Sequence, residues 1–176
     1  MSESRVLPLR PDELDDPQRT FMAPFTDAKG RFPNIFGVLC RDLPLMEAWR
    51  EFGLYLMSGS KVDPMLREVL ILRTSHRHNC AYEWHHHSRT ALKLGMSTEE
   101  VERIRTAETG FADHDLMMLV ADELADSSRL SDATWRLMTE RFGLDYTLDA
   151  IFTVGAYTAL AMGLNSADVQ VEGRGA

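Results

Sequence analysis

The positions of the prolines constrain the fold most strongly. All seven lie between residues 8 and 64, and the 112 residues after Pro64 contain none. Because proline breaks the interior of a helix, this second part of the chain can form long uninterrupted helices. Five prolines in the first 40 residues predict an extended N-terminal arm with turns, packed on the body. No strand pattern is found, so we predict an all-α protein with an arm at 1–40 and a single helical domain at 41–176.

Helix signals are clear in the second part of the chain. Asp63 followed by Pro64 is typical of an N-cap with proline at the first helical position. Gly95 predicts the end of a helix, and Ser97 with Glu100 predicts a capping box that starts the next one. The expected helices begin near residues 64, 79, 98, 113, 131 and 146. We predict a bundle of about six to eight helices.

The last expected helix, about 146–165, is apolar nearly all round. Its central apolar run, 150–164, is 15 residues long, which is shorter than the roughly 18 residues that suggest a membrane span. A helix of this kind must be buried on every side, and in a short chain another subunit would supply part of that burial. Gly155, Ala159 and Gly163 would let a second helix approach closely. We therefore predict a homo-oligomer, at least a dimer.

Charge and cysteine content exclude several classes of protein. The formal net charge is −8 and there is no basic run, which disfavours nucleic acid as a partner. Cys40 and Cys80 form no CxxC pair and are expected to be free thiols in a reducing compartment. The N-terminal residues lack the apolar stretch of a signal peptide. We predict a cytoplasmic protein without a membrane partner.

Residues 67–89 hold most of the groups that can carry chemistry. This segment contains five of the six histidines, one of the two cysteines and two glutamates. Cys80, Glu83 and His87 are spaced i, i+3 and i+7, which places them on one helical face. Trp84 shares or borders that face, so we expect it to point inward. Glu68, on the preceding helix, has apolar neighbours that would desolvate its carboxylate.

These four residues form a candidate proton-handling site. An imidazole exchanges protons near neutral pH, and a thiol near an imidazolium gains thiolate character. Simpler roles exist: Cys80 as a small buried apolar side chain, Glu83 and His87 as a helix-stabilising pair, and Glu68 as solvated or paired with Arg67 or Arg73. A metal site would use Glu83 and His87 with His76 or His78. No third ligand has firm spacing, so we predict neither metal nor cofactor.

This pattern resembles the carboxymuconolactone decarboxylase/AhpD-like (alkylhydroperoxidase-like) family over about residues 60–106. Glu68, Cys80, Glu83 and His87 fall on the glutamate and the C-x-x-C-x-x-x-H stretch of that family, and Gly95-Met-Ser continues the match. The second cysteine is replaced by Glu83, so the family's dithiol cycle is unavailable within this motif. A glutamate four residues before the histidine matches the decarboxylase branch. The resemblance implies an AhpD-like helical bundle that forms dimers, trimers or hexamers, with the site near subunit contacts.

The leading functional hypothesis is a decarboxylase-like or lactone-handling enzyme that transfers protons on a small organic acid. His87 would act as general acid/base, Glu68 would orient it or share its proton, and Glu83 would polarise the substrate or supply a second acid. The remaining candidates are Cys80 lining the site, Tyr82 and Trp84 as substrate-binding residues, and Arg73, Arg77 or Arg89 as anion partners. Two alternatives stay open: an alkylhydroperoxidase-like peroxidase that uses Cys80 as a single redox cysteine, and a non-catalytic helical oligomer or binding module.

Overall fold

The computed structural model describes residues 4–106 and 108–173, and these residues form helices, turns and loops without a strand. The all-α prediction is therefore confirmed. The nine α-helices of the described residues are α1 (Asp16–Met22), α2 (Asn34–Leu39), α3 (Leu43–Leu54), α4 (Pro64–Arg77), α5 (Ala81–Lys93), α6 (Thr98–Arg103), α7 (Ala112–Ser127), α8 (Asp132–Phe142) and α9 (Leu144–Ser166). Short 3₁₀ turns at Pro11–Glu13 and Ala23–Phe25 and a π-helix at Tyr55–Gly59 complete the order.

The chain divides into two compact units, and each is described by itself. The first combines the described residues up to Gly53 with those from Gly163 onward, and the second comprises Leu54–Met162. The candidate site residues all belong to the second unit.

The first unit contains more helix than the predicted arm. Asp15 caps α1 by accepting from the backbone N–H of Gln18 at 2.8 Å, and Pro17 lies in the first turn, where its missing N–H costs nothing. The prolines here therefore start helices as well as turns, which raises the helix number above the six to eight expected. Met22, Cys40 and Met46 are fully or almost fully buried in a small core of this unit. The packing of residues 1–40 on the body stays a prediction.

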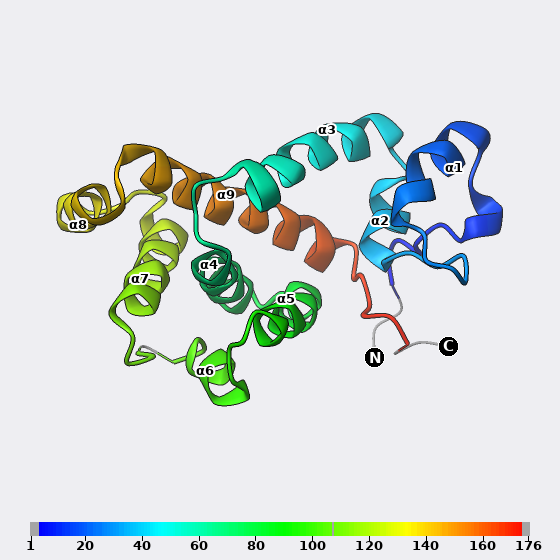
Figure 1. The fold of residues 1–176 in the computed structure, drawn as a ribbon. Coiled ribbons are helices and arrows are strands. Elements are labelled where there is room, and N and C mark those ends of the chain that lie inside the picture. The colour runs from blue at the N-terminus through cyan, green and yellow to red at the C-terminus, as the bar shows by residue number, and fades with distance from the viewer. Residues whose placement is uncertain (1–3, 107, 174–176) are drawn as a thin grey trace. The chain divides into compact units, whose positions relative to one another are not determined.

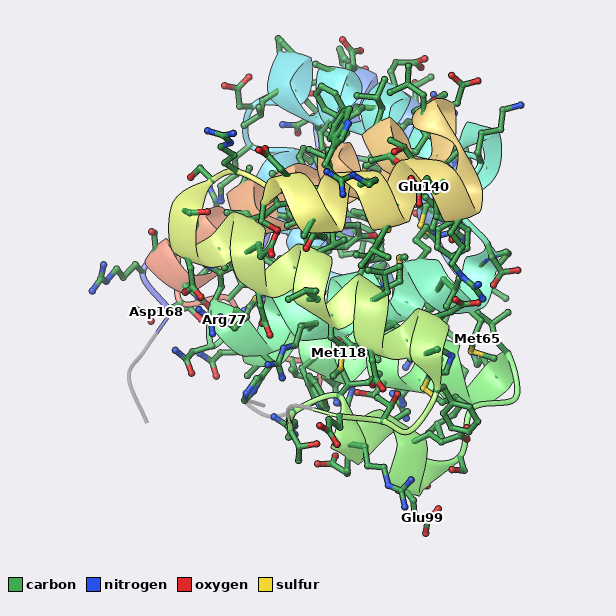
Figure 2. The ribbon with its side chains drawn as sticks, turned by 90° about the vertical axis from the view of Figure 1, so that its left-hand side faces the viewer. Met65, Arg77, Glu99, Met118, Glu140 and Asp168 are labelled. Atoms are coloured by element: carbon green, nitrogen blue, oxygen red, sulfur yellow. The ribbon has the colours of Figure 1, made fainter. Side chains whose placement is uncertain are left out.

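The second unit is built around α4, which packs against both α5 and α7 (Figure 1). Its residues from Arg67 to Ser75 are all buried. In Figure 2, Met118 on α7 lies within the unit, where it is 1% exposed, whereas Arg77 and Glu99 lie at its surface. The core around these helices includes Val69, Leu70, Leu72, Ala91, Met117, Met118, Val120, Ala150 and Val154.

The caps of this unit agree closely with the sequence. Asp63 accepts from the backbone N–H of Met65 at 2.8 Å, and Ser97 and Glu100 form the expected capping box. α5 begins at Ala81, two residues later than expected, because Asn79 adopts a left-handed conformation with φ +53°. This reversal separates α4 from α5 and leaves Cys80 as the N-cap residue of α5.

α9 is apolar on its exposed side as well as in the core. Ala150 and Val154 are buried, while Leu148, Phe152 and Met162 are exposed, the last two by 57% and 60%. By length and composition α9 could cross a membrane, but 44% of its most apolar window is buried inside the protein. Because the core helices of soluble proteins meet the same criteria, this one helix is weak evidence for a membrane span.

Candidate functional site

Two adjacent helices bring Glu68 and His87 into direct contact. Glu68 on α4 is 0% exposed, and its Oε2 lies 2.8 Å from Nδ1 of His87 on α5. The His87 side chain keeps 17% of its surface exposed. The expected alternatives for Glu68, solvation or pairing with Arg67 or Arg73, are therefore wrong, and the predicted partnership with His87 is present.

The contact fixes how the imidazole can act. Whichever of the two groups donates, the contact occupies Nδ1 of His87, so Nε2 is the ring nitrogen left for a substrate. The second oxygen of Glu68, Oε1, is buried and has no hydrogen-bond partner among the described residues. A carboxylate that holds a histidine in this way stabilises the imidazolium when it forms.

Glu83 lies one turn before His87 on α5 and is 2% exposed. Burial raises the pKa of its carboxyl group from 4.5 to about 8, although the Cys80 thiol and the Ser75 hydroxyl both act in the opposite direction. Ser75 donates to the carbonyl oxygen of Ile71 at 2.7 Å, and neither Glu83 oxygen has a partner at hydrogen-bond geometry among the described residues. Glu83 is therefore mostly protonated at neutral pH and can donate a hydrogen bond.

Cys80 is buried beside Glu83 and is a neutral thiol. Burial, together with the charge of Glu83, raises the pKa of the thiol from 9.0 to about 12, and this outweighs the backbone N–H groups of Tyr82 and Glu83, which lower it. Activation by the His87 imidazolium was expected from the shared helical face. The two residues are seven positions apart, about 10 Å along a helix, and the charge that acts on the sulfur is that of Glu83.

Tyr157 on α9 joins the site and was missed from sequence. Its ring lies edge-on to the His87 ring, with centroids 5.0 Å apart and planes at 89°. Burial and the charges of Glu68 and Glu83 raise the pKa of the Tyr157 hydroxyl, while Arg67 acts in the opposite direction. The signal available in the sequence was a tyrosine inside the apolar helix that had to pack on the motif helices.

The arginines expected as anion partners are engaged elsewhere. Arg73 binds both carboxylate oxygens of Asp122 at 2.7 Å and also donates to two backbone carbonyls. Arg77 is paired with Asp126, and Arg89 contacts His85 at 3.3 Å. Because Arg73 ties α4 to α7, its charge has a structural role.

Tyr82 and Trp84 point to other neighbours than the Glu68–His87 pair. The Arg105 guanidinium lies 3.5 Å from the centroid of the Trp84 ring, and the Tyr82 ring lies 4.5 Å from that of His86. Their role in substrate binding stays a prediction.

The histidines of the alternative metal site are also engaged elsewhere. His76 contacts the Trp84 ring, and Nε2 of His78 lies 3.1 Å from the Thr158 hydroxyl. Within the part of the chain that the structure describes, no three His, Cys, Asp or Glu side chains are grouped to hold a metal.

Residues 44–125 match the model of the Carboxymuconolactone decarboxylase family. This match covers a little under half of the chain. The predicted resemblance is confirmed, and the carboxymuconolactone decarboxylase segment contains Glu68, Cys80, Glu83 and His87, whereas Tyr157 lies outside it. A comparison with curated proteins gave no match.

Solved structures share the fold of this chain at low identity. The alkylhydroperoxidase AhpD core of an uncharacterized peroxidase-related protein from Ralstonia eutropha has a TM-score of 0.84 and 16% identity, and the match covers 98% of this chain and 94% of that one. An uncharacterized peroxidase-related protein from Silicibacter sp. has a TM-score of 0.81 and 16% identity, covering 91% and 87%. The debrominase Bmp8 has a TM-score of 0.74 and 13% identity, covering 96% and 92%. These similarities show an AhpD-like fold.

Proposed function

We propose that this protein is a cytoplasmic enzyme that transfers protons on a small organic acid, in a decarboxylation or a lactone reaction. The observation that carries the proposal is the buried Glu68–His87 contact of 2.8 Å beside a Glu83 whose pKa is raised to about 8. A histidine held by a carboxylate and a separate neutral acid are the two groups that general acid/base catalysis needs.

In a decarboxylation Glu68, Glu83 and His87 would each have a separate role. The bond from the substrate carbon to its carboxylate breaks, CO₂ leaves, and the electron pair moves into a neighbouring carbonyl to give an enolate. Protonated Glu83 donates a hydrogen bond to that oxygen as its charge develops. His87 then delivers a proton from Nε2 to the carbon, while Glu68 holds the ring and stabilises its charged form. The substrate's own carbonyl accepts the electrons, so we expect no organic cofactor.

The environment of Cys80 argues against the peroxidase alternative. A single-cysteine peroxidase attacks with the thiolate, and a pKa of about 12 leaves about one thiol in 10⁵ ionised at pH 7. The peroxidase-related neighbours share 16% identity, which supports a common fold only. Mass spectrometry after mild peroxide treatment separates the two functions: formation of sulfenic acid at Cys80 at a catalytic rate would favour the peroxidase.

A substrate panel tests the proposal. The purified protein is incubated with small β-keto acids and unsaturated lactone acids, and CO₂ release and ring opening are followed by NMR. We expect turnover of at least one compound, a loss of 10²-fold or more in kcat for His87→Gln, and a smaller loss for Glu68→Gln. The matched control is His85→Gln on the same helix, which should keep wild-type kcat.

Two outcomes contradict the proposal. One is wild-type kcat in the folded His87→Gln variant, which would show that the imidazole takes no part. The other is the absence of turnover across the panel by a folded protein, which would favour the non-catalytic alternative. Circular dichroism of each variant establishes that it is folded.

A further inference from the structure

One basic side chain beside the Glu68–His87 pair has no counter-charge. Arg67 is 7% exposed, and its Nη1 donates to the carbonyl oxygen of Leu56 at 3.3 Å. Its Nε is buried and has no hydrogen-bond partner among the described residues, which also place no carboxylate oxygen within 4.0 Å of it. A buried guanidinium without a counter-charge is costly, so this position is suited to an anion that arrives from outside the chain.

A continuous series of contacts leads from Arg67 to the proposed catalytic pair. Arg67 contacts Leu56, and the thioether of the next residue, Met57, lies 3.7 Å from the Tyr157 hydroxyl. The Tyr157 ring lies against the His87 ring, which contacts Glu68, the neighbour of Arg67 on α4. These contacts connect Arg67 with the Glu68–His87 pair through Leu56, Met57 and Tyr157, all within the second unit.

The carboxylates of the site do not neutralise Arg67. Glu68 binds His87, and consecutive residues on a helix point about 100° apart, so Glu68 and Arg67 diverge from α4. Glu83 is mostly protonated at neutral pH because burial raises its pKa to about 8. The negative charges of Glu68 and Glu83 raise the pKa of the Tyr157 hydroxyl, and the positive charge of Arg67 lowers it. All three residues therefore act on the same side chain.

We propose that Arg67 binds the carboxylate of the substrate, with the Tyr157 hydroxyl as a second donor. A guanidinium has a planar fork of N–H groups that matches the two oxygens of a carboxylate. Tyr157 now contacts the Met57 sulfur, a weak acceptor that a carboxylate oxygen can replace. The substrate class is then an organic acid whose carboxylate, held by Arg67, is retained through the reaction and is not the group that leaves as CO₂. The retention of this carboxylate rests on the proposed function, whereas carboxylate binding by Arg67 does not depend on that function.

Binding of simple carboxylates tests the proposal without turnover. Benzoate and acetate are titrated into the protein by calorimetry, with benzamide and acetamide as neutral analogues of similar shape. We expect the wild type to bind benzoate at least tenfold more tightly than benzamide. Arg67→Met should weaken benzoate binding at least tenfold. The affinity of Arg67→Lys for benzoate should lie between those of the wild type and Arg67→Met. Arg89→Met removes an exposed arginine from α5 and should bind benzoate as the wild type does.

The outcomes separate this site from the proposed reaction. Equal binding of benzoate and benzamide, no binding of benzoate, or unchanged binding in Arg67→Met overturns the proposal. If Arg67→Met does not fold, NMR of the wild type decides: the Arg67 Nε–H resonance must shift as benzoate is added, and an unmoved resonance overturns the assignment. His87→Gln should lose turnover and keep benzoate binding. Carboxylate binding without turnover of any substrate would therefore reject the reaction and retain the anion site.

Discussion

Glu83→Gln should remove a large pH dependence of stability. Burial raises the pKa of Glu83 from 4.5 to about 8 in the folded protein, and the unfolded chain returns it to its ordinary value. Each pKa unit corresponds to 1.36 kcal/mol, so the full effect is about 5 kcal/mol. This is comparable with the whole free energy of unfolding of many domains, which is about 5–15 kcal/mol.

The sign of the effect follows from which state binds the proton. Between pH 4.5 and 8 the folded protein keeps Glu83 protonated while the unfolded chain has lost that proton. The stability that this carboxyl group contributes is fully present below pH 4.5 and is lost as the pH rises through about 8. The wild type should therefore lose about 1.4 kcal/mol per pH unit in this window from Glu83 alone.

Urea unfolding at pH 5, 6, 7 and 8 measures this slope. Glu83→Gln places a neutral amide of the same shape in the site. Its free energy of unfolding should therefore fall less steeply with pH than that of the wild type, and the two slopes should differ by about 1.4 kcal/mol per pH unit. Glu140→Gln is the matched control, because Glu140 is exposed on α8 (Figure 2) and its removal should leave the wild-type slope unchanged. Parallel profiles for the wild type and Glu83→Gln would refute the reasoning that burial keeps Glu83 protonated.

Three further predictions concern reactivity, packing and assembly. Cys80 should react with a disulfide reagent at pH 7.5 about 10³-fold more slowly than a free cysteine, and reaction at the free rate would contradict its raised pKa. Asp122→Asn should destabilise the protein by about 3 kcal/mol in urea unfolding, because it leaves the buried Arg73 guanidinium without its carboxylate; a loss under 1 kcal/mol would contradict this role. Sedimentation should show a homo-oligomer for the wild type and a 20.0 kDa species for Phe152→Asp on the exposed face of α9, while Leu137→Asp on α8 should stay oligomeric. A monomeric wild type would contradict the predicted assembly.

The local signals in the sequence predicted the helices of the second unit well. Asp63 and Ser97 cap the helices that they were expected to cap, because an N-cap depends on residues within one turn. Proline gives a weaker signal, because it occurs both in extended segments and in the first turn of a helix. The proline content predicts an extended arm that includes Pro17, but Pro17 lies in the first turn of α1, where proline is well tolerated.

The candidate site was predictable where one motif carries it. Glu68 and His87 are 19 residues apart on consecutive helices, and spacing together with the family resemblance indicated their meeting. The roles of the arginines were not predictable, because Arg73 finds Asp122 49 residues away through the packing of α4 on α7. Tyr157 comes from a third helix that carries no motif, so only the tertiary fold places it against His87.

Deuterium incorporation tests the central claim most directly. With a turned-over carboxylate substrate in D₂O, the product should gain one deuterium at the carbon next to the carbonyl if His87, as proposed, exchanges its proton with solvent and delivers it. His87→Gln should bind benzoate as tightly as the wild type and incorporate deuterium at least 10²-fold more slowly. Incorporation at the wild-type rate in folded His87→Gln would contradict the account of proton transfer by the Glu68–His87 pair.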